Sequence, residues 1–294
     1  MRREVVVQKN PKSPVSEIFR TLRTNIQFMN SKNSLKSLLI TSTLPGEGKS
    51  WVAANLAVTF AKAGKRVVLI DADMRKGRQH QIFNLENDFG LSNYLSGIDE
   101  NTDNSIYKYL QRTEEPSLFL ISRGAIPPNP SELLAPEMIV NMLNELKQKF
   151  DLIIFDGTPS LILTDAVILS RFVDSTLIVT EFNMTKKENL AKIKRDIENV
   201  GGKIAGVVIN KIPKQGRKYS SSYYYNYHYT YGEKEHNKEK QTKPRASKEY
   251  SELANVEPQE SEQINNTAPE INTSEEQQRI IRQKVEEYLR QSQK

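Results

Sequence analysis

The sequence contains no cysteine, and this absence removes several kinds of chemistry at once. Disulfide bonds, thiol nucleophiles and cysteine metal sites are excluded, and the absence suits a reducing cytosol. The three histidines, His80, His228 and His236, are scattered along the chain, so we expect no histidine-built metal site. No apolar run reaches the ~18 residues that a membrane-spanning helix needs. The N-terminus also lacks the apolar core of a signal peptide, so we predict a cytoplasmic protein.

The apolar residues are spread unevenly over the 294 residues. They fill the chain to about Val208 and thin out after Pro213, where Lys, Glu, Gln, Asn and Ser dominate. We therefore predict a folded domain over residues 1–213, a tyrosine-rich tail over 214–232 and a polar, mostly disordered extension over 233–294. The net charge of +6 fits an ordinary basic protein as well as one that meets an anionic membrane surface or an acidic partner.

An apolar run, a glycine-containing loop and a helical pattern follow one another between Ser37 and Leu56. We predict a buried strand over 38–40, a phosphate-binding loop over 41–48 and a helix from Lys49. Loop amides and the helix N-terminus would bind a phosphate, the Lys49 ammonium would reach the outer phosphates, and the Ser50 hydroxyl would meet magnesium. The alternative is a strained loop with a surface lysine. The predicted nucleotide contacts in this stretch are Thr43, Pro45, Gly46, Glu47, Gly48, Lys49, Ser50 and Trp51.

Carboxylates follow two further predicted strands. Asp71 and Asp73 come directly after a buried strand over 67–70, and Asp156 follows another over 152–155. Open α/β sheets bind ligands at the carboxyl ends of their strands, which is where these acids would lie. They are suited to hold hydrated magnesium and to orient or deprotonate an incoming hydroxyl. The alternative is a set of strand-end turns with solvated acids.

Strands and helices continue to alternate down the chain. Strands over 176–179 and 204–209 are separated from each other and from earlier ones by helices over 165–172 and 186–200. Short all-apolar strands with helices between them indicate a mostly parallel sheet covered on both faces. We therefore predict an α/β, P-loop NTPase-type fold. Asn210 follows the last strand and is a candidate contact to the nucleotide base, with a simple polar loop start as the alternative.

The N-terminal region is expected to form a strand over 4–7 and a helix from about Ser13 to Met29. The helical spacing predicts one apolar stripe, made of Val15, Ile18, Leu22, Ile26 and Met29. Glu17, Arg20 and Arg23 fall on the other side of that helix. Spacing alone favours a solvated face for these three, with a subunit contact through arginine forks as the alternative.

The tail contains a dense group of tyrosines, KYSSSYYYNYHYTYG. A buried strand is a poor explanation because polar residues alternate with the tyrosines, and a base-stacking surface for nucleic acid fits less well than a multi-site phosphoacceptor. We expect disorder over 232–272 and a marginal amphipathic helix over 274–291. The candidate phosphoacceptors are Tyr219, Tyr223, Tyr224, Tyr225, Tyr227, Tyr229 and Tyr231.

Taken together, the segments TSTLPGEGKS, VVLIDADMR, LIIFDGTP and EIFRTLR and the tyrosine cluster resemble the bacterial tyrosine kinases of capsule and exopolysaccharide synthesis, in their stand-alone form. The resemblance covers about residues 1–231. It implies a kinase that uses ATP and Mg2+, with Asp71 and Asp156 at the metal site and Asp73 positioning or activating the tyrosine.

The same resemblance implies how the protein is assembled and regulated. Glu17, Arg20 and Arg23 would mediate a homo-oligomeric ring, in which the tail of one subunit enters the active site of its neighbour. It also implies protein tyrosine substrates and a membrane adaptor of the polysaccharide co-polymerase type, which recruits the kinase to the inner face of the membrane. It implies no nucleic-acid partner.

Two features depart from the family pattern. Trp51 stands where relatives usually have a Thr or Ser hydroxyl for the α-phosphate, and the extension has no counterpart in the resemblance. Two other functions fit parts of the sequence. One is a switch ATPase like the partition and septum-placement proteins, which carry a signature lysine where this chain has Thr43. The other is a nucleotide-binding scaffold without turnover, for which Trp51 is the hint.

Overall fold

The computed structural model describes residues 5–29, 35–97 and 105–213. The seven candidate phosphoacceptor tyrosines, the predicted disordered extension and the predicted terminal helix lie outside these ranges. Among the helices that are described, none is long and apolar enough to cross a bilayer.

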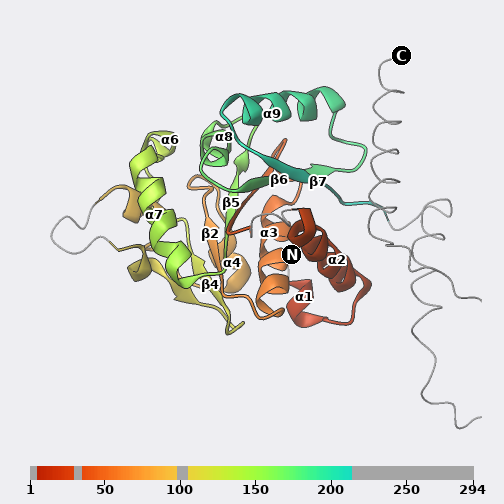
Figure 1. Ribbon diagram of the computed structural model, residues 1–294, viewed down its shortest axis with the longest axis horizontal. Helices are drawn as coiled ribbons and strands as arrows, with labels where there is room; N and C mark the ends of the chain where they lie inside the picture. The colour runs from red at the N-terminus through yellow and green to blue at the C-terminus, as the bar shows by residue number, and fades with distance from the viewer. Residues whose placement is uncertain (1–4, 30–34, 98–104, 214–294) are drawn as a thin grey trace, which may run out of the picture. The chain divides into compact units, whose positions relative to one another are not determined.

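A seven-stranded sheet forms the centre of the domain (Figure 1), with the strand order β3-β4-β2-β5-β1-β6-β7. All neighbouring strands are parallel except the short β3, which pairs antiparallel with β4. The strands are β1 (Ser37–Ser42), β2 (Val67–Asp71), β3 (Gln111–Arg112), β4 (Leu118–Ile121), β5 (Leu152–Pro159), β6 (Ser175–Glu181) and β7 (Ile204–Asn210). The predicted mostly parallel α/β fold is therefore confirmed.

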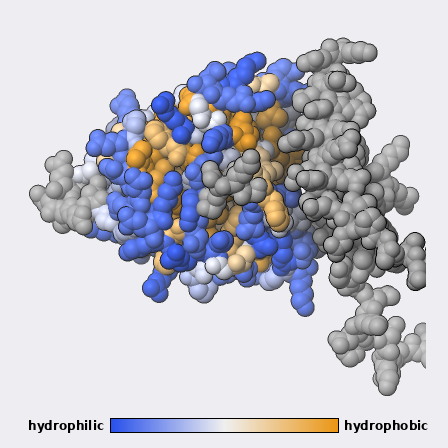
Figure 2. Space-filling model, in the orientation of Figure 1, coloured by the Kyte–Doolittle hydropathy of each residue, from blue (hydrophilic) through white to orange (hydrophobic). Residues whose placement is uncertain are grey.

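Helices cover both faces of this sheet, as the apolar strands require. One face packs against α1 (Val6–Lys9), α2 (Pro14–Met29) and α3 (Lys49–Ala61), with α4 (Gln79–Phe83) beside them. The opposite face packs against α5 (Leu91–Leu95), α6 (Pro130–Leu133), α7 (Pro136–Lys149), α8 (Asp165–Ser170) and α9 (Lys187–Asn199), together with the 3-10 helix Ile106–Tyr109. Hydrophilic side chains cover most of the face seen in Figure 2, and apolar ones show between them.

The central strand β1 is buried along its whole length, and it leads directly into the phosphate loop. Helix α3 starts at Lys49, after Gly48 in the left-handed region with φ of 98°. The chain turns away again at Gly64, where φ is 84°. The strand, loop and helix predicted from the glycine-containing stretch are thus confirmed, with a longer strand and a helix that ends at Ala61.

The predicted strand over residues 4–7 is wrong, because Val6–Lys9 forms one helical turn. Val5 and Val7 are buried against the core, and the backbone N–H of Val7 donates to Asn55 Oδ1 of α3 at 3.1 Å. The valines favour a strand only where a neighbouring strand exists, and here the neighbour is a helix.

The stripe expected on α2 is only partly correct. Val15, Leu22 and Ile26 pack on the core, but Ile18 and Met29 are 56% and 57% exposed. Phe19 takes the buried place instead, since its ring fits against Trp51 of α3. The start of α2 is as predicted, with the Ser13 hydroxyl accepting the backbone N–H of Ser16 at 3.1 Å.

Candidate active site

The phosphate loop is held closed by the carboxylate of Glu47, which is 3% exposed. One of its oxygens accepts the backbone N–H groups of Thr43 at 2.7 Å and Leu44 at 2.9 Å. The other oxygen accepts the hydroxyls of Thr43 and Thr185. Three of these bonds tie the start of the loop to its end, and the fourth ties the loop to Thr185 after β6; Thr43 therefore supports the loop through Glu47.

Asn210 closes the loop from the end of β7. Its Nδ2 donates to the backbone oxygen of Glu47 at 2.8 Å. A Cβ atom on Gly48 would lie 2.2 Å from the same nitrogen, so only glycine allows this approach. The structure places Asn210 against the loop backbone, and its expected contact to a nucleotide base stays a prediction.

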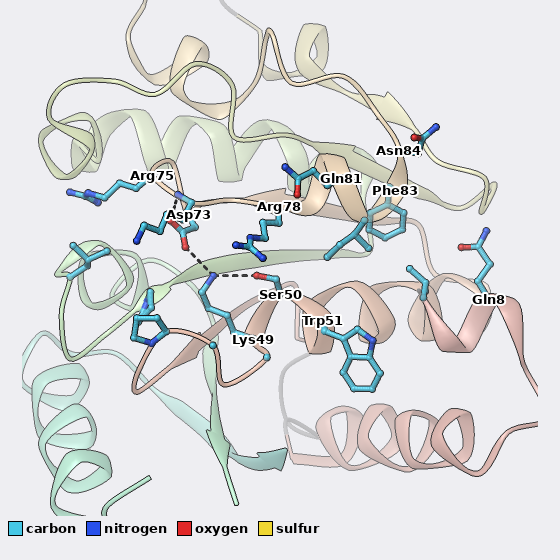
Figure 3. A pocket seen from close by; sticks show the side chains of 18 of the residues that line it. Gln8, Lys49, Ser50, Trp51, Asp73, Arg75, Arg78, Gln81, Phe83 and Asn84 are labelled. Atoms are coloured by element: carbon cyan, nitrogen blue, oxygen red, sulfur yellow. Dashed lines mark hydrogen bonds and ion pairs between the residues drawn. The ribbon is translucent and has the colours of Figure 1, made fainter. Parts of the chain in front are cut away.

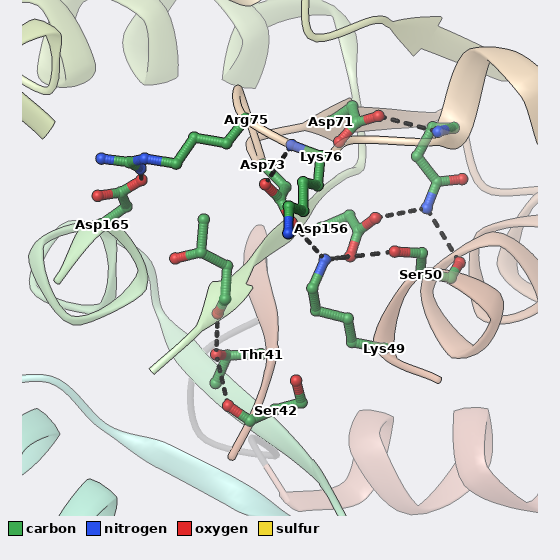
Figure 4. A network of polar contacts seen from close by, with 12 residues as sticks. Thr41, Ser42, Lys49, Ser50, Asp71, Asp73, Arg75, Lys76, Asp156 and Asp165 are labelled. Carbon is green, nitrogen blue, oxygen red and sulfur yellow. Dashed lines mark hydrogen bonds and ion pairs between the residues drawn. The ribbon is translucent and has the colours of Figure 1, made fainter. Parts of the chain in front are cut away.

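The Lys49 ammonium group lies among the predicted acids (Figure 4). Its Nζ is 3.1 Å from Asp73 Oδ2 and 3.3 Å from Asp156 Oδ1. It also donates to Ser50 Oγ at 3.3 Å. Burial lowers the pKa of Lys49, but the charges of Asp156, Asp73 and Asp71 outweigh burial, so its pKa lies above the usual value. Residues that are far apart in the sequence thus converge on one cation.

Asp71 and Asp156 lie side by side, because they are paired in register on β2 and β5. Both are fully buried. Burial, followed by the charge of Asp156, raises the pKa of Asp71 well above its usual value. Asp71 Oδ1 has no hydrogen-bond partner among the described residues. Two buried carboxylates this close favour a cation, since desolvation and mutual repulsion both oppose their charges.

The donor set suits magnesium, although it does not enclose a metal. Within residues 5–29, 35–97 and 105–213, no three His, Cys, Asp or Glu side chains are arranged to hold an ion by themselves. Magnesium in nucleotide sites is commonly held by one or two carboxylates, phosphate oxygens and water. Asp71, with its unpartnered oxygen, and Asp156 supply such carboxylates, and Ser50 supplies a hydroxyl at the start of α3.

A cavity of about 1080 Å³ opens beside Lys49 and Asp73 (Figure 3). Pro45, Gly46 and Gly48 of the loop line it, and so do Ser50 and Trp51. Basic side chains line its other wall, namely Arg75, Lys76 and Arg78. The cavity therefore combines a phosphate loop with cationic groups and the Asp73 carboxylate.

Two supporting groups were not singled out from the sequence. Gln79 contacts Asp71, Asp156 and Ser50. Asp165 pairs with Arg75, whose other terminal nitrogen donates to Ser131 Oγ at 3.1 Å. The pattern carries no signal for either group, because each depends on residues brought together only by the fold.

The predicted interface residues do not belong to this site. Arg20 pairs with Glu17 on the same helix and donates to the backbone oxygen of Pro11 at 2.7 Å. Arg23 lies one turn further along, and its Nε is buried with no partner among the described residues.

Comparisons with known proteins assign the chain to a family. A family model described as an AAA domain matches residues 35–207. The chain is 41% identical over 219 residues to the putative tyrosine-protein kinase CapB of Staphylococcus aureus, covering 74% of this chain and 93% of that one. The chain belongs to the bacterial tyrosine kinases.

Solved structures of bacterial tyrosine kinases agree with this assignment. The kinase domain of the Escherichia coli tyrosine kinase ETK matches with a TM-score of 0.68 and 32% identity, over 72% of this chain and 81% of that one. The chimerical protein CapA2B2 matches with a TM-score of 0.66 and 40% identity, over 71% and 90%. As a member of this family the chain is a protein-tyrosine kinase with a nucleotide-binding fold.

The cell-division ATPase MinD of Pyrococcus furiosus is a more distant match, at 23% identity and a TM-score of 0.53. That likeness shows the fold alone. The kinase interpretation is therefore favoured over the switch ATPase.

Proposed function

We propose that this kinase transfers the terminal phosphoryl group of ATP to tyrosine side chains, mainly those of its own tail in a neighbouring copy. The observation that carries the proposal is the convergence of Lys49 with Asp73 at 3.1 Å and Asp156 at 3.3 Å. In-line transfer to a hydroxyl needs a lysine at the phosphate loop and a carboxylate that faces the cavity.

Lys49, Asp73 and Asp156 have separate roles in this reaction. Lys49 binds the outer phosphates and stabilises the charge that develops on the transferred group. Asp73 then moves partly away from Lys49, and its carboxylate accepts the hydrogen bond of the tyrosine hydroxyl. The new bond forms between the phenol oxygen and phosphorus, the bond from phosphorus to the bridging oxygen of ADP breaks, and the phenol proton passes to Asp73.

Asp71, Asp156 and Ser50 are the residues that would hold magnesium. The bound ion neutralises phosphate charge when it is present. The nucleotide contacts are those predicted above: the loop residues, Trp51 beside them, and Asn210 at the end of β7.

The acceptors are the seven tyrosines between Tyr219 and Tyr231. Each phosphate adds about −1.5 to −2 charges. Several of them within thirteen residues repel one another, and this repulsion loosens an assembly held together by the tail. Phosphorylation thereby limits its own extent and gives the kinase a cycle of assembly and release.

Assembly and location follow from the same proposal. Glu17, Arg20 and Arg23 form the subunit contact of a homo-oligomeric ring. A membrane adaptor of the polysaccharide co-polymerase type activates the kinase at the inner face of the membrane, and the cycle regulates capsular or exopolysaccharide synthesis and export. The match to the chimerical protein CapA2B2 supports an adaptor without naming it.

Phosphosite mapping tests the proposal. The purified protein is incubated with Mg-ATP, with and without an adaptor-tail peptide, and its phosphotyrosines are mapped by mass spectrometry. We expect phosphate on the tail of the wild type and its loss in Lys49→Met. Lys62→Met is the matched control, since Lys62 lies just beyond α3 and pairs only loosely, at 3.8 Å, with Glu115. Release of phosphate to water with an unmodified tail would reject the kinase reaction in favour of the switch ATPase.

A further inference from the structure

Gln79 connects three parts of the site through its backbone N–H and its buried side chain. It is the first residue of α4 and is fully buried. Its backbone N–H donates to Asp71 Oδ2 at 2.9 Å, and its Nε2 donates to Asp156 Oδ2 at 2.8 Å. The same Nε2 donates to the backbone oxygen of Ser50 at 3.0 Å. The ends of β2 and β5 and the start of α3 are thus held by one glutamine.

The orientation of this carboxamide is determined by its neighbours. A carboxylate and a backbone carbonyl can only accept hydrogen bonds, so both must face the NH2 group of Gln79. The carboxamide oxygen Oε1 therefore points away from Asp156 and Ser50. It is buried and has no hydrogen-bond partner among the described residues.

Gln79 also decides which oxygen of each carboxylate is available. The Oδ2 atoms of both Asp71 and Asp156 are occupied by its two donors. Asp156 Oδ1 faces the Lys49 ammonium at 3.3 Å, and Asp71 Oδ1 has no donor. Gly77 leaves room for that oxygen, since a Cβ there would lie 2.4 Å from Asp71 Oδ1.

We propose that Gln79 is a positioning residue for magnesium: it holds Oδ2 of both Asp71 and Asp156, which leaves Asp71 Oδ1 free for the hydrated ion and Asp156 Oδ1 facing Lys49. The unpartnered Oε1 of Gln79 and Oδ1 of Asp71 are the acceptors that water molecules on such an ion would meet, because buried acceptors are rarely left without a donor. Magnesium keeps several waters in nucleotide sites, which supplies those donors. This role rests on the proposed function, since it concerns the ion that serves phosphoryl transfer.

Calorimetric titration with ADP tests this role without turnover. The dissociation constant is measured in excess Mg2+ and in EDTA for the wild type, Gln79→Met and Gln79→Glu. Methionine keeps the length of the side chain and removes the Nε2 donor to Asp156 and Ser50, whereas glutamate keeps the shape and presents oxygen to Asp156; the backbone N–H to Asp71 remains in both variants. In the wild type Mg2+ should lower the dissociation constant of ADP relative to EDTA. We expect this factor to be about 10- to 100-fold smaller in both variants, the usual cost of losing a group that orients metal ligands. Affinity in EDTA should stay close to that of the wild type in Gln79→Met, because that substitution adds no charge to the site.

Gln111→Met is the matched control, because Gln111 also makes hydrogen bonds, to the Glu86 backbone at the edge of the sheet. It should respond to Mg2+ as the wild type does. Circular dichroism identifies which variants are folded.

If Mg2+ strengthens ADP binding by the same factor in a folded Gln79 variant and in the wild type, the role of Gln79 alone is overturned. An equal loss of ADP affinity in Mg2+ and in EDTA would show that Gln79 has only a structural role. A wild type whose ADP binding ignores Mg2+ would instead overturn the magnesium-dependent function, and this inference with it.

Discussion

The ring of Trp51 meets the ring of Phe19 edge to face, with centroids 5.3 Å apart and planes at 66°. Trp51 is the third residue of α3 and lines the cavity above Lys49. Phe19 lies on α2, the helix that also carries the proposed interface residues. The helix proposed for assembly is therefore packed directly on a residue next to the phosphate loop. Trp51 has a packing role that its position in the sequence did not indicate.

Replacing Trp51 with threonine should exchange that packing for a hydroxyl. We expect Trp51→Thr to lower the free energy of unfolding by about 1 kcal/mol or more, since an edge-to-face pair contributes ~0.5–1.5 kcal/mol beyond the area it buries. The affinity for ADP should rise, because the hydroxyl can reach the α-phosphate. Urea denaturation and calorimetry measure the two effects. Trp51→Phe, which keeps an aromatic ring, should lose less stability, and an equal loss in both variants would argue against the ring contact.

The sheet could be predicted from the sequence because its central strands are buried on both faces. A run such as residues 67–70 must then be apolar throughout, and it is bounded by glycine or charged residues. The buried side of α2 was predicted less well. Spacing allowed either Ile18 or Phe19 inside, and the choice depends on Trp51, which lies on another helix.

The site shows the same division between local and long-range information. Lys49, Asp71, Asp73 and Asp156 could be found because a phosphate loop and strand ends place them by local rules. Gln79 could not, since its partners Ser50 and Asp156 are 29 and 77 residues away. Hydrogen bonds over such separations exist only once the strand order is known.

Adding a methyl group at Gly48 should block nucleotide binding. The new Cβ would lie 2.2 Å from Asn210 Nδ2, so Asn210 would have to move off the loop. Gly64→Ala is the matched control, because Gly64 also has a positive φ, of 84°, but has open space around it. Both variants should lose about 1–2 kcal/mol of stability to the left-handed backbone, and only Gly48→Ala should lose ADP binding by calorimetry.

A second-site change tests the cause of that loss. Asn210→Ala removes the clashing amide, so the double variant Gly48→Ala/Asn210→Ala should regain part of the affinity for ADP. If the double variant binds no better than Gly48→Ala, the backbone of the loop rather than Asn210 is responsible.

Replacing Asp73 with asparagine should separate catalysis from nucleotide binding. The amide cannot take the phenol proton, so we expect tail phosphorylation to slow about 100-fold or more, within the usual range for a general base. ADP affinity should change only a few-fold, because Lys49 keeps its contact with Asp156 at 3.3 Å. Initial rates of phosphotyrosine formation and calorimetry give the two values. Asp88→Asn, an exposed site, serves as the control, and an unchanged rate in Asp73→Asn would remove Asp73 from the mechanism.

Removing the Arg23 side chain should weaken assembly more than removing that of Arg20. Arg20 already pairs with Glu17 on its own helix, whereas Arg23 Nε is buried without a partner among the described residues. A carboxylate from a second copy would pair with the guanidinium of the half-buried Arg23, and a charge-assisted bond of that kind contributes about 1.5–3 kcal/mol. Light scattering over a concentration series should therefore show Arg23→Ala dissociating at roughly 10-fold or more higher concentration than the wild type. Arg195→Ala, on the exposed face of α9, should assemble normally. Equal assembly of Arg23→Ala and the wild type would place the subunit contact elsewhere on the kinase.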